Sequence, residues 1–120
     1  MRYLLVFIGG GLGSLVRFQI SEWCSKYPLT FPLATLISNV FACFIIGILT
    51  GLSLKNQLHI HHKLLFATGF CGGFSTFSTF SIETLRLFQT QNMATAYLNL
   101  FLSLILCLSA TFVGLKISAF

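Results

Sequence analysis

The stretch Gly69–Phe80, GFCGGFSTFSTF, decides how this chain folds. It lies within an apolar segment long enough to cross a bilayer, yet it contains the pair Gly72-Gly73 and leads into a run of hydroxyl residues between 75 and 81. Each glycine costs a helix about 1 kcal/mol relative to alanine. A freed backbone at membrane depth is tolerated only where protein or a water-filled cavity covers it. The sequence therefore predicts a membrane-crossing helix that is interrupted at Gly72-Gly73.

The composition is that of a chain whose solvent is lipid. Of the 120 residues, 56% are hydrophobic and 8% are charged, whereas soluble domains carry about 25% charged residues. Four windows reach the roughly 20 apolar residues that a crossing requires, and they are residues 4–21, 31–52, 63–88 and 93–116. The expected fold class is an all-α membrane protein, in which residues 1–120 form one domain of four transmembrane helices with the third helix broken.

Cationic residues are spread almost evenly over the two ends of such a bundle. With four crossings, both termini and the middle loop share one side of the membrane. That side carries Arg2, Lys55, Lys63 and Lys116, and the other side carries Arg17, Lys26 and Arg86. Because orientation follows the excess of Lys and Arg in short loops, the sequence predicts insertion in both orientations, which is dual topology. The same scattering argues against a nucleic-acid-binding surface.

Residues for catalysis or for a metal cluster are not grouped in this sequence. The only acidic residues are Glu22 and Glu83, and both are expected near the ends of spans. The four cysteines lack the spacing of a zinc or disulfide framework, and the three histidines of the loop at residues 55–62 have no Cys, Asp or Glu beside them. Proton-driven transport normally needs a carboxylate near the middle of the membrane. The sequence therefore indicates neither an enzyme nor a small multidrug exporter.

Uncharged donors point instead to a small ion. Asn39 lies deep in the second window, and further donors are the hydroxyls of Ser78, Thr79 and Ser103. Phenylalanine rings add electropositive edges. Such a set suits a dehydrated anion, because conduction requires sites that an ion is able to leave. An interrupted backbone at 72–75 offers carbonyl oxygens, which suit a cation. For Asn39, a hydrogen bond between helices is an equally good interpretation.

Four-residue spacings predict which helix faces meet other helices. Gly9 and Gly13 in the first window, and Gly47 and Gly51 in the second, have the small-residue spacing of close helix contacts. On the fourth window one face carries Asn99, Ser103 and Cys107. A single polar track on an apolar helix usually faces another helix or a wet path.

Three segments make the chain resemble the Fluc (CrcB) family of fluoride channels. They are GGGLGSLVRF at 9–18, PLATLISNVFACFIIG at 32–47 and GFCGGFSTFSTFSIE at 69–83, and the resemblance covers essentially the whole chain. It implies an antiparallel, dual-topology homodimer in the lipid bilayer of the cell inner (plasma) membrane. It also implies two fluoride pathways, through which fluoride leaves the cytoplasm passively so that its toxicity is reduced.

The resemblance further implies roles for individual residues. Those along the fluoride pathway are Asn39, Phe77, Phe80, Ser78, Thr79 and Ser103. Asn39 donates to fluoride, the two phenylalanines present their ring edges, and Ser78 and Thr79 flank the path. The backbone carbonyls of Gly72 and Ser75 from both subunits hold a central sodium ion, which is the one cofactor implied. Arg17 and Glu83 have a vestibule or structural role.

Two other functions remain open from the sequence. One is an ion-coupled fluoride exporter, and the other is a non-transporting membrane assembly protein whose polar residues only join helices. Fluoride flux that needs a second gradient indicates the exporter, and the absence of any flux indicates the assembly protein.

Overall fold

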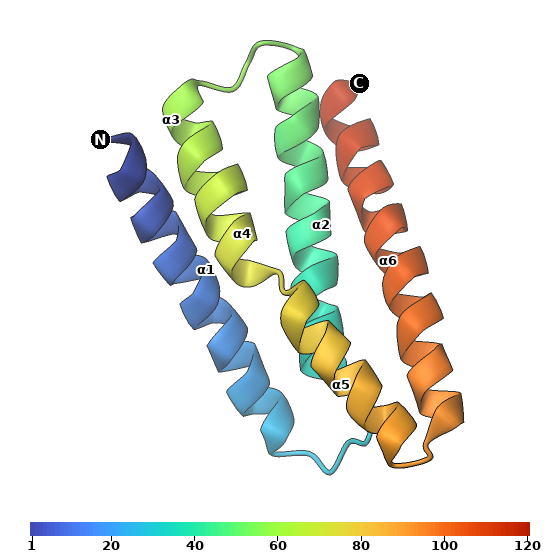
Figure 1. Ribbon diagram of the computed structural model, residues 1–120. Helices are drawn as coiled ribbons and strands as arrows, with labels where there is room; N and C mark the ends of the chain where they lie inside the picture. The colour runs from blue at the N-terminus through green and yellow to red at the C-terminus, as the bar shows by residue number, and fades with distance from the viewer.

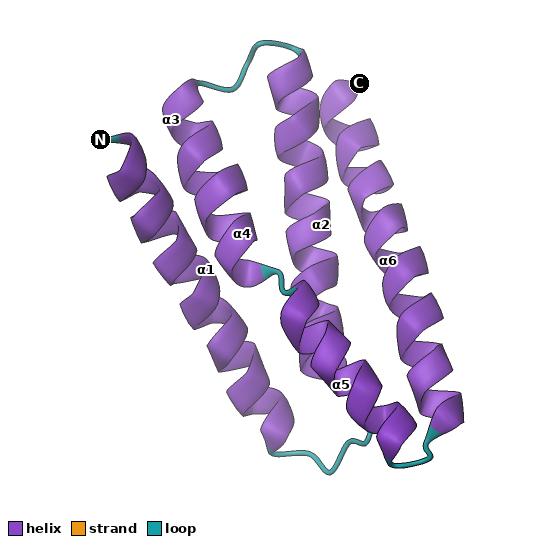
Figure 2. Ribbon diagram, in the orientation of Figure 1, coloured by secondary structure: helices purple, strands orange, loops and turns teal.

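The computed structural model describes residues 1–120, and it is helical throughout with no strand (Figures 1 and 2). Its elements are α1 (Arg2–Ser25), α2 (Leu33–Leu54), α3 (Ile60–His62), the π-helix η1 (Lys63–Cys71), α4 (Gly72–Phe74), α5 (Phe77–Gln89) and α6 (Met93–Ala119). The predicted all-α class is confirmed.

Three of these helices, α1, α2 and α6, are long and apolar enough to cross a membrane. They overlap the first, second and fourth windows expected from the sequence. Only 11% of the apolar window of α1, and the same share of that of α6, is buried inside the chain. Long apolar helices that remain this exposed need lipid or other protein around them, because water does not solvate such surfaces favourably.

Glycines bring the helices together in two closely packed pairs. Gly9 and Gly13 of α1 lie so close to the backbone of η1 that a Cβ atom at either position would meet Leu65 O or Phe70 O. Gly47 of α2 lies in the same way against Thr111 O of α6. The close contacts predicted from the four-residue spacing are therefore confirmed.

The α2–α6 pair is parallel. Gly47 of α2 lies against the backbone at Thr111, and Gly51, one turn later, lies against Ser118. The α6 helix also contributes a glycine to this contact, because Gly114 lies against Phe44 O of α2. From Gly47 to Gly51 of α2 the contacted residue of α6 rises from Thr111 to Ser118, so the two helices run in the same direction.

The chain between α2 and α6 is helical but interrupted at Ser75 and Thr76. Ser75 has φ −79° and ψ 155°, and Thr76 has φ −152° and ψ 117°, so that extended backbone separates α4 from α5 (Figure 2). Gly72 and Gly73 lie within α4, and the interruption predicted at these glycines is wrong in position. Position 73 requires glycine because of packing and not because the helix breaks there. A Cβ atom at this position would collide with Gly10 O of α1.

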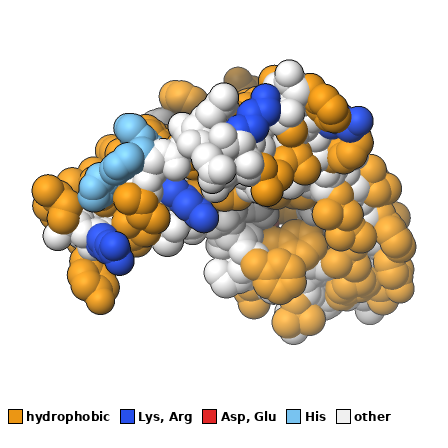
Figure 3. All heavy atoms as spheres, turned by 90° about the horizontal axis from the view of Figure 1, so that it is seen from above, with side chains coloured by type: hydrophobic (Ala, Val, Ile, Leu, Met, Phe, Trp, Pro, Cys, Tyr) orange, Lys and Arg blue, Asp and Glu red, His pale blue; other side chains and the backbone are white.

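The two ends of the bundle are occupied by different connections. Both termini and the connection from α2 to α3 lie at one end, and the connections from α1 to α2 and from α5 to α6 lie at the other (Figure 1). Figure 3 looks down on the first of these ends, where Lys, Arg and His side chains lie among hydrophobic ones and no acidic side chain is seen. The α5 helix descends from the middle of the bundle and packs against α6.

Candidate functional site

Asn39 of α2 bridges the interruption. Its Oδ1 accepts a hydrogen bond from Thr76 N at 2.7 Å, and its Nδ2 donates to Thr76 O at 3.1 Å. In a continuous helix Thr76 N would donate to Gly72 O, so the amide replaces a bond that the interruption removes. A primary amide carries two N–H donors. One N–H of Asn39 therefore remains for another partner.

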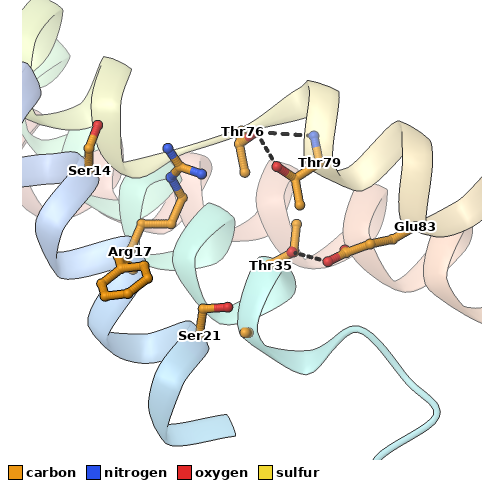
Figure 4. Close-up of a pocket in the computed structure, with 9 residues that line it drawn as sticks. Ser14, Arg17, Ser21, Thr35, Thr76, Thr79 and Glu83 are labelled. Atoms are coloured by element: carbon orange, nitrogen blue, oxygen red, sulfur yellow. Dashed lines mark hydrogen bonds between the residues drawn. The ribbon is translucent and has the colours of Figure 1, made fainter. Parts of the chain in front are cut away.

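Thr76 also begins the helix that follows. Its Oγ1 accepts from Thr79 N at 3.2 Å and donates to Thr79 Oγ1 at 3.1 Å (Figure 4). The same oxygen lies 3.2 Å from Ser78 Oγ. This is N-capping, in which a threonine oxygen satisfies an N–H of the first turn. The sequence analysis gave Thr76 no role. The signal was a threonine preceding an apolar helical pattern that restarts after a break.

Gly72 O and Ser75 O are among the backbone carbonyls that lose their helical donors at the interruption. Gly72 O would accept from Thr76 N in a continuous helix, and Ser75 O would accept from Thr79 N. Both of these N–H groups instead donate to side-chain oxygens, of Asn39 and Thr76 respectively. Gly72 is exposed, and nothing lies within 4 Å of the position of a Cβ atom there. Carbonyl oxygens freed in this way are the ligands that sodium takes at unwound helices, so these two residues fit the ion.

A cavity of about 590 Å³ adjoins the interruption on the α6 side. We call it the phenylalanine cavity. Its walls include Asn39, Ser75, Phe77, Phe80, Ser103 and Cys107, together with apolar residues of α6. The two rings stand with centroids 5.6 Å apart at 42°, and Phe77 is 79% exposed. The fold thus brings these six residues, all singled out in the sequence, around one cavity.

A smaller and more polar cavity, of about 210 Å³, lies on the α1 side of the interruption (Figure 4). We call it the arginine cavity, and its polar residues are Ser14, Arg17, Ser21, Thr35, Thr76, Thr79 and Glu83. Arg17 Nε donates to Gly73 O at 3.1 Å, which ties α1 to the last turn before the interruption. Thr76 lines both cavities, so the interrupted segment forms the wall between them.

Glu83 lines the arginine cavity, where it contacts Thr35 close to the N-terminal end of α2. Its Oε1 accepts from Thr35 Oγ1 at 3.0 Å, and its buried Oε2 has no hydrogen-bond partner. The hydrogen bond between Thr35 and Glu83 links α2 to α5 on the C-terminal side of the interruption. The sequence analysis gave Thr35 no role. The available signal was its four-residue spacing from Asn39, because that spacing places both side chains on one face of α2.

The remaining predicted residues lie in different places. Thr79 belongs to the arginine cavity, whereas Ser78 is exposed and lines neither cavity. Gly72 lines neither cavity as well.

The polar track of α6 divides between a helix contact and a cavity. Asn99 is 1% exposed, and its Nδ2 donates to Thr84 Oγ1 of α5 at 2.8 Å. Thr84 Oγ1 in turn donates to Phe80 O at 2.8 Å, and Ser103 Oγ donates to Asn99 Oδ1 at 3.3 Å. This network fixes the backbone that carries the Phe80 ring. Ser103 and Cys107, by contrast, reach the phenylalanine cavity.

Comparison with known protein families identifies the family of this chain. The family model described as "CrcB-like protein, Camphor Resistance (CrcB)" matches residues 4–115. The chain belongs to the CrcB family. Membership confirms the family recognised from the sequence motifs, and with the three long apolar helices it makes this CrcB chain a membrane protein.

Curated relatives match the CrcB chain over nearly its whole length. One from Azobacteroides pseudotrichonymphae genomovar. CFP2 is 43% identical over 121 residues, which cover 99% of this chain and 97% of the relative. One from Thermus thermophilus is 42% identical over 117 residues, with coverages of 97% and 92%. One from Pyrococcus abyssi is 41% identical over 112 residues, with coverages of 92% and 90%. Each of these relatives is named fluoride-specific ion channel FluC.

Proposed function

We propose that this CrcB chain is a passive fluoride channel of the plasma membrane and not an enzyme. Fluoride leaves the cytoplasm through it down its electrochemical gradient, and fluoride toxicity falls as a result. The observation that carries the proposal is the phenylalanine cavity, where the amide that bridges the interruption meets two aromatic rings. The names of relatives at 41–43% identity support fluoride as the ion.

The proposed path uses uncharged groups in place of water. Asn39 contributes the N–H that its contact with Thr76 leaves over. Phe77 and Phe80 contribute ring edges, which carry partial positive charge. Ser103 contributes its hydroxyl, which donates to fluoride once its hydrogen bond of 3.3 Å to Asn99 Oδ1 is broken. Because no fixed charge binds the ion in this cavity, fluoride is able to leave each site, as conduction requires.

The arginine cavity is the proposed vestibule. Arg17 supplies the positive charge that raises the local concentration of anions. Its Nε is engaged by Gly73 O, which leaves the outer guanidinium nitrogens for the cavity. Thr79 and Ser78 flank the path on either side of the Thr76 cap, which both of their side chains contact. Glu83 lines the same cavity, with its Oε1 held by Thr35.

Sodium is the proposed structural ion. When bound, it supplies a fixed positive charge that holds carbonyl oxygens together. The residues that would hold it are Gly72 and Ser75, through the carbonyls that the interruption frees. Asn39 and Thr76 prepare this site, because their side chains take the two N–H groups that would otherwise occupy the carbonyls.

An antiparallel homodimer completes the proposal. Gly72 and Phe77 lie beside the interruption and are both exposed in a single chain. A second copy would cover them and bring two sets of freed carbonyls together. The similar numbers of Lys and Arg at the two ends favour insertion in both orientations, which an antiparallel pair needs.

A proton-coupled fluoride exporter is the second candidate, and one observation favours it. The buried Oε2 of Glu83 lacks a hydrogen-bond partner in a polar cavity next to the proposed path. Intramembrane carboxylates of this kind mark proton relays in transporters.

Fluoride efflux from liposomes tests the proposal. The purified chain is reconstituted in liposomes loaded with potassium fluoride, with equal pH and equal sodium on both sides, and valinomycin releases potassium. A channel gives fluoride efflux under these conditions and none of chloride. Efflux that appears only with a pH gradient identifies the exporter, and efflux no faster than from empty liposomes supports a non-transporting assembly protein.

A further inference from the structure

Cys43 of α2 and Cys107 of α6 face each other across the parallel helix pair. Gly47 lies against Thr111 O, and one turn earlier on each helix brings Cys43 level with Cys107. Both thiols are free, and both line the phenylalanine cavity. Neither cysteine contributes to the proposed fluoride path, so this pair of thiols has no assigned role.

We propose that Cys43 and Cys107 form a two-thiolate site for a soft monovalent metal ion of the Cu(I) and Ag(I) class. Thiolate sulfur is the ligand that selects such ions over harder ones. Each thiol loses its proton to water as its sulfur–metal bond forms, and the metal keeps its oxidation state. Two thiolates and one monovalent cation give a complex with one net negative charge.

The surroundings of the pair favour a two-coordinate ion. Structural zinc takes four N or S ligands, and no group of three or more His, Cys, Asp or Glu residues able to hold a metal is present. Cys71 is 5% exposed and does not line the cavity. Cys24 lies near the end of α1 and does not line the cavity either. The site therefore consists of two sulfur atoms, reached from the cavity.

Metal at this site has a consequence that rests on the proposed function. Asn39 and Ser103, one turn before Cys43 and Cys107, line the same cavity. A negative complex beside them repels fluoride and narrows the space that the ion crosses. Loading the site is expected to slow fluoride efflux.

Silver binding to the purified full chain tests the site. Silver nitrate in chloride-free buffer is the probe, and bound silver is measured by equilibrium dialysis with elemental analysis. In a background of Cys24→Ala and Cys71→Ala, one tightly bound silver ion per chain is expected. Adding Cys43→Ala or Cys107→Ala is expected to weaken binding at least about tenfold. Serine replacements repeat the series if an alanine variant does not fold. Unchanged silver affinity after removal of both cysteines overturns the proposal.

Fluoride efflux separates this proposal from the proposed function. Inhibition by silver is expressed relative to each variant's own metal-free rate of fluoride efflux. In the variant with both cysteines replaced, silver is expected no longer to inhibit efflux. Silver bound by the pair, in a chain without any fluoride efflux, supports the site and overturns the proposed function. Normal efflux, with no silver bound by the pair, overturns the site and leaves the proposed function standing.

Discussion

Asn39 holds Thr76 by both polar atoms of its side-chain amide, at 2.7 Å to the backbone nitrogen and 3.1 Å to the backbone oxygen. One side chain thus satisfies the donor and the acceptor of a residue that no helix includes. Buried backbone groups are expensive to leave unpaired, so the interruption depends on this residue. The same amide lines the cavity proposed for fluoride.

Replacing Asn39 by aspartate is expected to impair conduction at least about tenfold. Aspartate still accepts from Thr76 N but does not donate to Thr76 O, and its charge repels an entering anion. Liposome efflux measures the effect, and size-exclusion chromatography in detergent checks that the variant assembles like the parent chain. Full efflux by the aspartate variant would remove Asn39 from the path.

Phe80→Ile is expected to reduce fluoride efflux strongly while leaving assembly intact. Isoleucine fills much of the volume of the ring but has no electropositive edge. Phe112→Ile is the matched control, because Phe112 lies on α6 away from the phenylalanine cavity. Equal efflux from both variants would show that the Phe80 ring does not contact the ion.

The two neighbouring glycines are expected to respond differently to alanine. At Gly73 a Cβ atom meets the Gly10 backbone, whereas at Gly72 nothing lies within 4 Å. Overpacking costs typically about 1–3 kcal/mol, so Gly73→Ala should lower thermal stability in detergent. Gly72→Ala should leave the stability of the single chain intact. Equal melting temperatures for the two variants would contradict the contact between α1 and α4.

Thr76→Val is expected to destabilise α5 by about 1 kcal/mol, the usual cost of a lost N-cap. Valine keeps the shape of threonine but removes the oxygen that accepts from Thr79 N. Thr76→Ser keeps that oxygen and is the control. Thermal unfolding in detergent measures the difference. A valine variant as stable as the serine variant would show that the cap contributes nothing.

Removal of sodium is expected to abolish fluoride efflux reversibly. The carbonyls of Gly72 and Ser75 have lost their helical donors, so without a cation they face each other unneutralised in the proposed dimer. Efflux is measured after exhaustive exchange of sodium for N-methylglucamine, and then after sodium is returned. Undiminished efflux in sodium-free liposomes would refute a structural sodium ion.

The sequence predicted the helical class and the close helix contacts well, because both depend on local patterns. Apolar windows of about 20 residues mark membrane helices whatever packs around them, and Gly9, Gly13 and Gly47 each lie where their spacing placed them. The family was also recognisable, since the motif at 69–83 is long.

The position of the interruption was beyond local reasoning. Glycine propensity pointed to Gly72-Gly73, but those residues stay helical because α1 needs Gly73 to be small. The extended residues are Ser75 and Thr76, whose hydrogen bonds come from α2 and from the next helix. The contact between Glu83 and Thr35 was not predictable for a similar reason, because the two residues are 48 positions apart in the chain. Tertiary partners decided both features.

The extended pair Ser75-Thr76 also has an electrostatic consequence. It divides one long helix macrodipole into two shorter ones that meet end to end in the middle of the bundle. The carbonyl end of η1 and α4 carries roughly −0.5 of an elementary charge, and the amide end of α5 roughly +0.5. Two non-helical residues separate these opposite partial charges. A chain with few ionised side chains in its interior thereby presents, almost side by side, a pole that attracts cations and a pole that attracts anions.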